Sequence, residues 1–427
     1  MTPDRTRLAV GGFSTLVIFT LLAGDAWRDS ISWWGFGVLA VLLVAGSVIL
    51  FLRPRPLVAW KKLPKTLALF MLLCVISIAW SFYPGATALG VLVQWCTTLV
   101  ALFLALCLSW EELLRALGSA LRWILGLSLL FEFVVAAFVR NPILPFWTDY
   151  SGHIPQAFYW SRALLFRDGQ IQGILGNSNL LSMAALLALI VFGVQYADRT
   201  VRRGWGVAWI VIAIVTLALT RSSTVIVAAV FTAVVLVFAL WTRAARPERR
   251  LPIYLSMVAV TGAAVVSAIT FSGPLLQLLG KSDSLTGRTG IWQTVITLAQ
   301  QRPAFGWGWV SYWAPWVEPF KQLAVIKGVT YLQAHNAWLD VWLQLGILGL
   351  IVFATLVLST FWRTWFFAVD RPRTSLAERT PFSAITLLPL LILAALLAQS
   401  AAESRMLVEG GWMLLVVISV KTKLARP

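Results

Sequence analysis

The sequence predicts an all-α integral membrane protein with about twelve transmembrane helices, and three observations lead to this class. Of its 427 residues, 59% are hydrophobic and 12% are charged, with a mean hydropathy of +0.84, which is far above that of soluble domains. Runs of about 20 apolar residues, enough to cross a hydrocarbon core of about 30 Å, recur along almost the whole chain. The basic residues gather between these runs, so the net charge of +17 indicates contact with anionic membrane lipid and no nucleic acid partner.

The apolar runs place the individual spans along one polytopic membrane domain covering residues 1–427. The first run follows Arg5 and Arg7 as a signal peptide would, but it lacks a small-residue cleavage site, so we expect a retained helix. Cys74, Cys96 and Cys107 fall inside apolar runs and suit core packing. The expected spans are 8–24, 31–52, 66–82, 87–108, 118–139, 175–196, 205–219, 223–241, 251–272, 337–361, 383–402 and 407–420.

The positive residues orient these spans, because loops that stay in the cytoplasm carry an excess of lysine and arginine. With both termini cytoplasmic, most of the 34 basic residues lie inside, and the short outer loops keep only Arg28, Arg221 and Arg405. Two long connections, 140–174 and 273–336, then lie outside the cytoplasm. Both are rich in aromatic residues, so we expect them to fold against the membrane surface.

The second long connection contains an amphipathic stretch, "LTGRTGIWQTVITLAQQRPAFGWGW", which is expected to form a helix that lies along the membrane before the tenth span. Arg288 stands at its start, where the helix dipole already favours anions. A surface arginine is the alternative interpretation. Pro303 and the glycines of "FGWGW" end the helix in a tight return.

Two earlier features of the sequence suit an anion site at the same outer face. Arg221 occupies a turn of a few residues between two apolar runs, where the topology rule disfavours a cation. It serves an anion site, reaches a lipid phosphate by snorkelling or caps a helix C-terminus. Asn177 and Asn179 open another span as an N-cap residue and a neighbouring amide.

His335 lies just before the tenth span and, with His153, is one of two histidines in the chain. An imidazole on the outer face is suited to accept a proton near neutral pH. Asn336, Asp340 and Gln344 follow at helical spacing and form a polar stripe, which normally faces protein or water and not lipid. Asp340, or alternatively Glu403 in the last outer loop, is a candidate to orient the imidazole.

These parts suit a reaction on a diphosphate that is attached to a lipid. Arginine forks neutralise a leaving diphosphate in place of a divalent metal, for which the sequence offers no carboxylate cluster. A neutral base takes the proton of an attacking hydroxyl. We therefore expect glycosyl transfer from a polyprenyl-diphosphate sugar, with no metal and no cofactor.

Two segments of the sequence resemble a known family. "GRTGIWQTVITLAQQRPAFGWGW" followed by "HNAWLDVWLQLGILGL" is similar to the signature of the O-antigen ligase and Wzy-type polymerase family, which includes exopolysaccharide-production polymerases. The resemblance covers roughly residues 170 to 350. Where family members often have Ser-Arg-Gly at the earlier turn, this chain has Thr220, Arg221 and Ser222.

The resemblance implies a multi-pass protein of the bacterial cytoplasmic (inner) membrane with its active site on the extracytoplasmic face. The implied activity joins an undecaprenyl-diphosphate-linked glycan to a glycan or glycolipid acceptor, without metal and with inversion. Arg288 and Arg221 would bind the diphosphate and His335 would act as base. We expect the substrate also to contact Arg405, Asn177, Asn179, Asn336 and Asp340.

Two rival interpretations remain open. A polyprenyl-phosphate-sugar glycosyltransferase would use acidic residues in the first outer loop, where Asp25 and Asp29 stand. A transporter or flippase for a lipid-linked saccharide would show broken helices and charges deep in its spans, and Glu132 is the clearest such charge. The sequence also leaves the choice between ligase and polymerase open.

Overall fold

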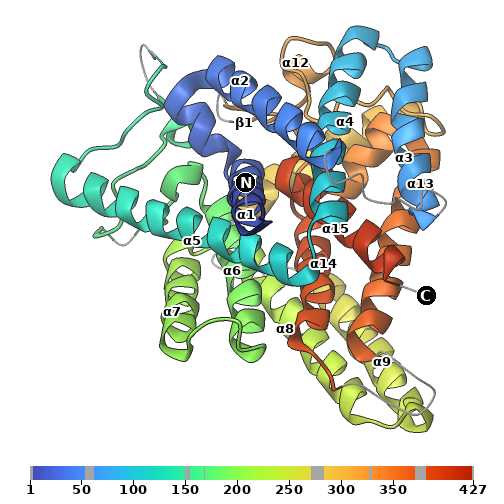
Figure 1. Cartoon of the computed structure of the whole chain (residues 1–427). Coiled ribbons are helices and arrows are strands. Elements are labelled where there is room, and N and C mark those ends of the chain that lie inside the picture. Colours follow the sequence, from blue (N-terminus) through green and yellow to red (C-terminus); the bar gives the residue numbers. More distant parts are fainter. Residues whose placement is uncertain are drawn as a thin grey trace.

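The computed structural model describes residues 3–52, 62–148, 150, 154–167, 169–270, 283–326, 329–370 and 381–425 (Figure 1). Within these ranges the chain is helical apart from irregular loops and a hairpin of two-residue strands, β1 (Val325–Ile326) and β2 (Val329–Thr330). The helices are α1 (Pro3–Leu22), α2 (Gly24–Leu52), α3 (Lys65–Ile76), α4 (Pro84–Cys107), α5 (Trp110–Val134), α6 (Ser178–Ala197), α7 (Arg203–Thr220), α8 (Ser223–Ala244), α9 (Leu251–Thr270), α11 (Asp283–Gln301), α12 (Phe320–Leu323), α13 (Ala337–Val369), α14 (Leu388–Ser400) and α15 (Glu409–Leu424).

The prediction of an all-helical integral membrane protein is confirmed. A helix lies at each expected span in the described part of the chain. By length and composition, seven of the described helices suffice to cross a membrane, namely α2, α4, α5 with its continuation to Val139, α6, α7, α8 and α13. Shorter apolar helices cover Arg7–Leu22, Lys65–Trp80 and Ala384–Ser400. The total of twelve spans stays a prediction.

Some helix ends lie outside the limits expected from the apolar runs. α5 begins at Trp110, well before the expected start at 118, because Ser109 and Glu112 form a reciprocal capping box that stabilises a polar first turn. α13 continues to Val369 past the expected end at 361. Apolar runs mark what the membrane accommodates, whereas caps determine where the helix itself starts and stops.

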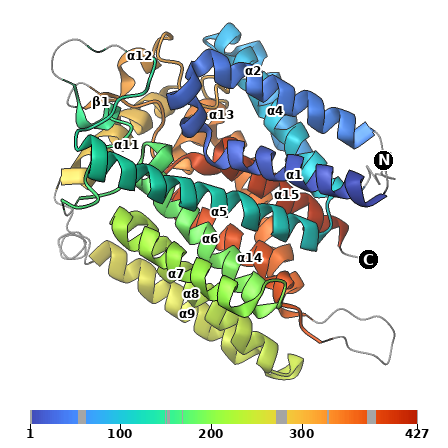
Figure 2. The same cartoon turned by 60° about the vertical axis from the view of Figure 1, so that its left-hand side comes forward.

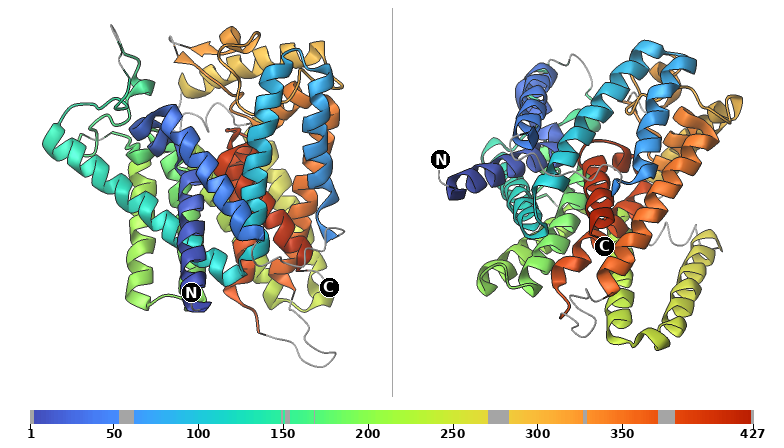
Figure 3. Two further views of the ribbon diagram at one scale, coloured as in Figure 1. Left: turned by 45° about the horizontal axis from the view of Figure 1, so that its top comes forward. Right: turned by 45° about the vertical axis from the view of Figure 1, so that its right-hand side comes forward.

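The last two helices form the centre of the bundle. α14 packs against α8 and α6, while α15 packs against α4, α13 and α1, and the view in Figure 3 (right) places both inside the other helices. Most residues of α14 and α15 are buried. A helix that is apolar on every side is expected at such a central position.

Both ends of the chain lie at one end of the bundle, and α11, α12 and the hairpin lie at the opposite end, hereafter the loop end (Figures 2 and 3). α11 is amphipathic, as predicted: Ile291, Val295 and Ala299 are buried on one side, and α11 packs against α13. The first long connection is fixed to α5 by buried Glu132, which accepts N–H groups from Gln172 and Gly173 at 2.8 and 2.7 Å. Glu132 therefore holds a loop in place.

α13 is broken at Gly346, whose φ of 66° is open to glycine at little cost. The segment 303–308 completes the interrupted hydrogen bonds, because Trp307 N donates to Leu343 O at 3.0 Å and Ile347 N donates to Pro303 O at 2.8 Å. A Cβ on Gly346 would lie 2.2 Å from Ala304 O. Gly306 and Gly346 thus serve one close contact between two backbones.

Candidate functional site

Three helices begin at the loop end, each with a side-chain cap on its first turn. Asn177 caps α6, Ser222 caps α8 and Asn336 caps α13, in each case through an oxygen that accepts backbone N–H groups. Ser222 Oγ also lies 2.7 Å from Asn179 Oδ1, which joins the starts of α6 and α8. Helix starts carry partial positive charge, so their clustering favours a bound anion.

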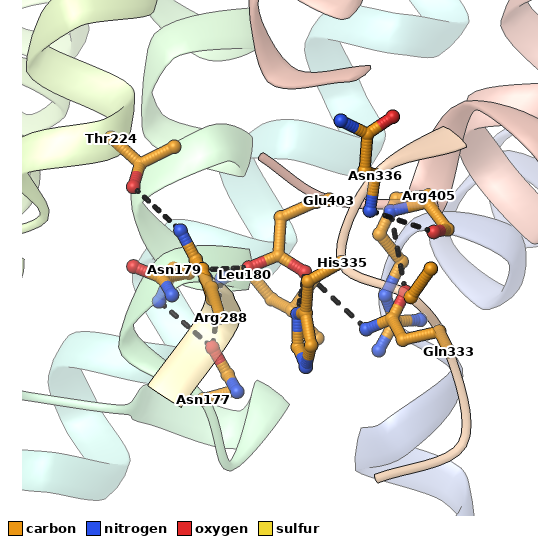
Figure 4. A network of polar contacts seen from close by, with 12 residues as sticks. Asn177, Asn179, Leu180, Thr224, Arg288, Gln333, His335, Asn336, Glu403 and Arg405 are labelled. Atoms are coloured by element: carbon orange, nitrogen blue, oxygen red, sulfur yellow. Dashed lines mark hydrogen bonds and ion pairs between the residues drawn. The ribbon is translucent and has the colours of Figure 1, made fainter. Parts of the chain in front are cut away.

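Arg288 connects these helix starts to the last loop. Its guanidinium lies 3.5 Å from Thr224 Oγ1 in the first turn of α8 and 2.7 Å from Glu403 Oε1. Figure 4 shows Arg288 between Thr224, Asn177 and Asn179 on one side and Glu403 on the other. The side chain is 14% exposed, so the ion pair is largely shielded from solvent.

Glu403 is the centre of the polar network. Oε1 accepts from Arg288, whereas Oε2 accepts from Gln333 at 3.3 Å and lies 2.7 Å from His335 Nδ1. Burial raises the pKa of Glu403, but His335, Arg288 and Arg405 outweigh this effect and hold the pKa below its ordinary value. The side chain is therefore a carboxylate at neutral pH.

His335 is held with one ring nitrogen engaged and the other free. Its backbone is left-handed, with φ of 50°, directly before the Asn336 cap. Its ring packs edge-on against the ring of Tyr331, with 5.3 Å between the two ring centroids. Because the ionised Glu403 accepts a hydrogen bond from Nδ1–H, a neutral His335 carries its hydrogen on Nδ1 and its lone pair on Nε2. Nε2 is buried and has no hydrogen-bond partner among the described residues. The Nε2 lone pair of a neutral His335 is thus not engaged by any hydrogen-bond donor among the described residues.

The second predicted arginine lies at the edge of this network. Arg221 ends α7 in a left-handed conformation with φ of 47°, is exposed, and directly precedes the Ser222 cap. Its carbonyl oxygen accepts the Gln170 amide at 3.4 Å. Arg221 therefore belongs to the same turn as the start of α8, while Arg288 makes the contact with Glu403.

Arg405 belongs to a neighbouring group of charges. It pairs with Glu409 at 3.0 Å and Asp25 at 3.5 Å, and Arg28 pairs with the same two carboxylates at 2.6 and 2.5 Å. This four-charge cluster (Asp25, Arg28, Arg405 and Glu409) joins the starts of α2 and α15. Asp25, Arg405 and Glu409 of this cluster line a cavity of about 50 Å³ together with leucines of α6 and α14. Asp25, one of the two acids that the glycosyltransferase rival would use, is therefore held in ion pairs.

The polar stripe on α13 faces protein, as its sequence pattern predicts. Asp340 accepts from Trp313 Nε1 at 2.8 Å and from Ala334 N at 3.0 Å, and it also bonds to Ser404. Gln344 Oε1 accepts from Val310 N at 2.8 Å. Asp340 thus fixes the two loops that carry His335 and Glu403, and of the two candidate carboxylates Glu403 is the one that contacts the imidazole.

Asn336 makes the same kind of connection, because its amide donates to Ala401 O at 3.2 Å and its N–H donates to Ser404 Oγ at 3.2 Å. The roles of Asn177, Asn179, Asn336, Asp340 and Arg405 in substrate binding stay predictions. Sequence reasoning missed Gln333 and Thr224 altogether, since neither a glutamine in a loop nor a threonine in the first turn of a helix stands out. His153 lies outside the described residues.

Comparison with known proteins adds a family to this geometry. A model of the family described as "O-Antigen ligase" matches residues 208–354, which include Arg221, Arg288, His335 and Asn336. The chain is also similar to the exopolysaccharide production protein ExoQ of Rhizobium meliloti (strain 1021), with 29% identity over 126 residues. That match spans 28% of this chain and 28% of the relative. The resemblance noted in the sequence is confirmed, since residues 208–354 match the O-antigen ligase family and part of the chain is similar to an exopolysaccharide production protein.

Proposed function

We propose that this protein transfers a glycan from an undecaprenyl-diphosphate carrier to an acceptor hydroxyl at the extracytoplasmic face of the bacterial inner membrane. The observation that carries the proposal is the chain of contacts Arg288–Glu403–His335 beside the capped starts of α6, α8 and α13. It joins a fixed cation, a carboxylate and a base with a free nitrogen. The family's part in polysaccharide biosynthesis supports the same reaction.

In the proposed reaction the donor's diphosphate binds at Arg288, with the α6 and α8 starts and Arg221 around it. A guanidinium binds two phosphate oxygens at once, and the helix starts add backbone N–H groups in fixed positions. The negative charge that develops on the leaving diphosphate is then stabilised by protein groups alone. This arrangement accounts for a transfer that needs no divalent metal.

His335 acts as the base through Nε2. The acceptor oxygen forms a bond to the anomeric carbon while the bond from that carbon to the diphosphate oxygen breaks and its electron pair leaves with the carrier lipid. The acceptor's proton passes to Nε2 as the oxygen attacks. A single displacement of this kind inverts the anomeric centre. Glu403 holds the ring by Nδ1 and stabilises the imidazolium that forms.

The rival functions have less support. In a transporter, the backbone freed by a broken helix lines the substrate cavity, whereas the break in α13 is closed by residues 303–308. Glu132 accepts backbone N–H groups of a loop. Asp25, one of the two acids of the glycosyltransferase rival, is paired with Arg28 and Arg405. A flippase would still move lipid-linked glycan without forming a new glycosidic bond, so product analysis separates the two functions.

The test uses purified protein in lipid nanodiscs with a defined polyprenyl-diphosphate glycan and a panel of glycan and glycolipid acceptors, followed by mass measurement of the products. We expect a joined product and free polyprenyl diphosphate, both absent with His335→Ala. Arg249→Lys, in an exposed turn after α8, serves as a control that retains activity. A His335→Ala protein that forms product at the wild-type rate would contradict the proposal.

A further inference from the structure

The Glu403 carboxylate is shared between the two groups that the proposed reaction needs most. One oxygen lies 2.7 Å from the Arg288 guanidinium and the other lies 2.7 Å from His335 Nδ1. Glu403 is 5% exposed, so little water screens these contacts. Any change in the charge around Arg288 therefore alters how strongly the single carboxylate of Glu403 attracts a proton on His335.

In the arrangement described here, Arg288 and Glu403 neutralise one another. His335 then lies beside a pair with no net charge, so the carboxylate favours an imidazolium less than it would without the Arg288 counter-ion. A carboxylate without such a counter-ion favours the protonated ring much more strongly, because opposite charges a few ångströms apart attract in a shielded site. The strength of His335 as a base thus depends on what else Arg288 binds.

We propose that the donor's diphosphate draws the positive charge of Arg288 away from Glu403 and so makes His335 a stronger base only when a donor is bound. This inference rests on the proposed function and adds regulation to the same site. It implies an order of events in which the acceptor hydroxyl meets a competent base only after the diphosphate is in place. Glu403 is then a positioning residue that also transmits the occupancy of Arg288.

The other charged groups around this network keep partners of their own. Arg405, whose charge acts on Glu403, is paired with Glu409 and Asp25. Asp340, whose charge acts on His335, is bonded to Trp313 and Ser404. The Tyr331 ring meets His335 edge-on and carries no charge. Among the described groups, Arg288 alone combines contact with Glu403 and the proposed contact with the diphosphate.

The experiment follows the protonation of His335 directly. The chain has two histidines, so His153→Gln leaves His335 as the only imidazole in a protein purified without a polyhistidine tag. Imidazole ¹⁵N shifts of histidine-labelled full-length protein are recorded from about pH 5 to 9. The titration is repeated with farnesyl diphosphate and with farnesol, which shares the chain but lacks the diphosphate. Binding is followed separately by ³¹P line broadening.

With farnesyl diphosphate, we expect the proton affinity of His335 to rise about tenfold, as removal of a nearby counter-charge predicts. Farnesol should leave it unchanged. In Glu403→Gln the response to farnesyl diphosphate should disappear. Arg288→Gln provides a second test, since without the counter-ion His335 should already show the higher affinity before any ligand is added.

Two other results would overturn the inference and leave the proposed function standing. One is bound farnesyl diphosphate with no change at His335, and the other is an equal rise in Glu403→Gln, which would come from the phosphates themselves. A wild-type protein that fails to bind farnesyl diphosphate, or an Arg288→Gln protein that binds it equally well, would contradict the donor site itself and the coupling with it.

Discussion

Arg288 presents a planar fork of N–H groups to two partners at once, Thr224 on α8 and Glu403 in the last loop. We expect Arg288→Lys to reduce glycan transfer at least about 100-fold, because an ammonium cannot reproduce bidentate contact with a diphosphate. The measurement is the initial rate of product formation by mass spectrometry. Arg249→Lys provides the matched control, and near wild-type turnover of Arg288→Lys would refute the assigned role.

The Glu403 ion pair makes the stability of the folded protein depend on pH. Its pKa lies below the ordinary value, so its ion pair stabilises the folded protein above about pH 4.5 and this contribution is lost as the pH falls through the lowered pKa. Glu403→Gln should cost on the order of 3 kcal/mol at pH 7, as breaking a buried ion pair does.

The melting temperatures of wild type and Glu403→Gln in detergent, measured by intrinsic fluorescence between about pH 7 and about pH 2, check this expectation. The difference in melting temperature between the two proteins should decrease as the pH falls. A difference in melting temperature that is constant over this range would mean that the charge of Glu403 does not stabilise the folded protein.

The sequence identifies the residue types of the site better than it identifies their partners. His335 and Arg288 could be selected because a base and an arginine-led helix stand out among apolar residues. That Glu403 and not Asp340 contacts His335 depends on how α13 and the last loop pack, which no local pattern encodes. Arg405 pairs with Glu409 one turn later and with Asp25, far away in sequence. Only tertiary structure reveals the second of these partners.

Among the elements, the break in α13 at Gly346 is the feature most sensitive to a small change. Gly346→Ala would impose a positive φ on alanine and place its Cβ 2.2 Å from Ala304 O. We expect a loss of about 3 kcal/mol or more, because the loop 303–308 would be forced off the helix. Thermal unfolding in detergent measures this loss.

Gly193→Ala in α6 is the matched control. A Cβ there meets nothing within 4 Å, so the substitution should be neutral or should stabilise α6 by up to about 1 kcal/mol, as helix propensity predicts. Equal melting temperatures for Gly346→Ala and Gly193→Ala would show that the two-backbone contact does not matter to stability.

Helix positions follow from the sequence because apolar runs and turn residues are local signals. The early start of α5 comes from a capping box in a polar segment, which hydropathy does not register. The break in α13 does not follow from the sequence, since glycine is common in membrane helices and its φ depends on the loop that packs against it. The amphipathic α11 could be predicted because its apolar residues recur on one face.

For the whole molecule, the common position of both chain ends suits the predicted topology, with the loop end outside the cytoplasm. A cysteine introduced at Trp316, which is 70% exposed near the loop end, should react in intact cells with a maleimide that does not cross the membrane. A cysteine at exposed Glu248, between α8 and α9, should react only after permeabilisation, because the excess of arginines there marks the cytoplasmic side.

Cys74, Cys96 and Cys107 are buried or partly buried, and the unmodified protein measures their background labelling. Labelling of the Glu248 cysteine in intact cells and of the Trp316 cysteine only after lysis would reverse the orientation and place the proposed site on the wrong side for a lipid-linked donor that has already been translocated.

The interrupted helix also bears on how the protein is made. A span with unpaired backbone groups is costly in hydrocarbon until a partner covers them. The segment that covers Gly346 lies at residues 303–308, ahead of α13 in the chain. Ribosomes synthesise from the amino terminus, so this covering segment has already been translated when α13 enters the bilayer. A circular permutant that places 303–308 after α13 would reverse that order and should insert less efficiently while reaching the same final structure.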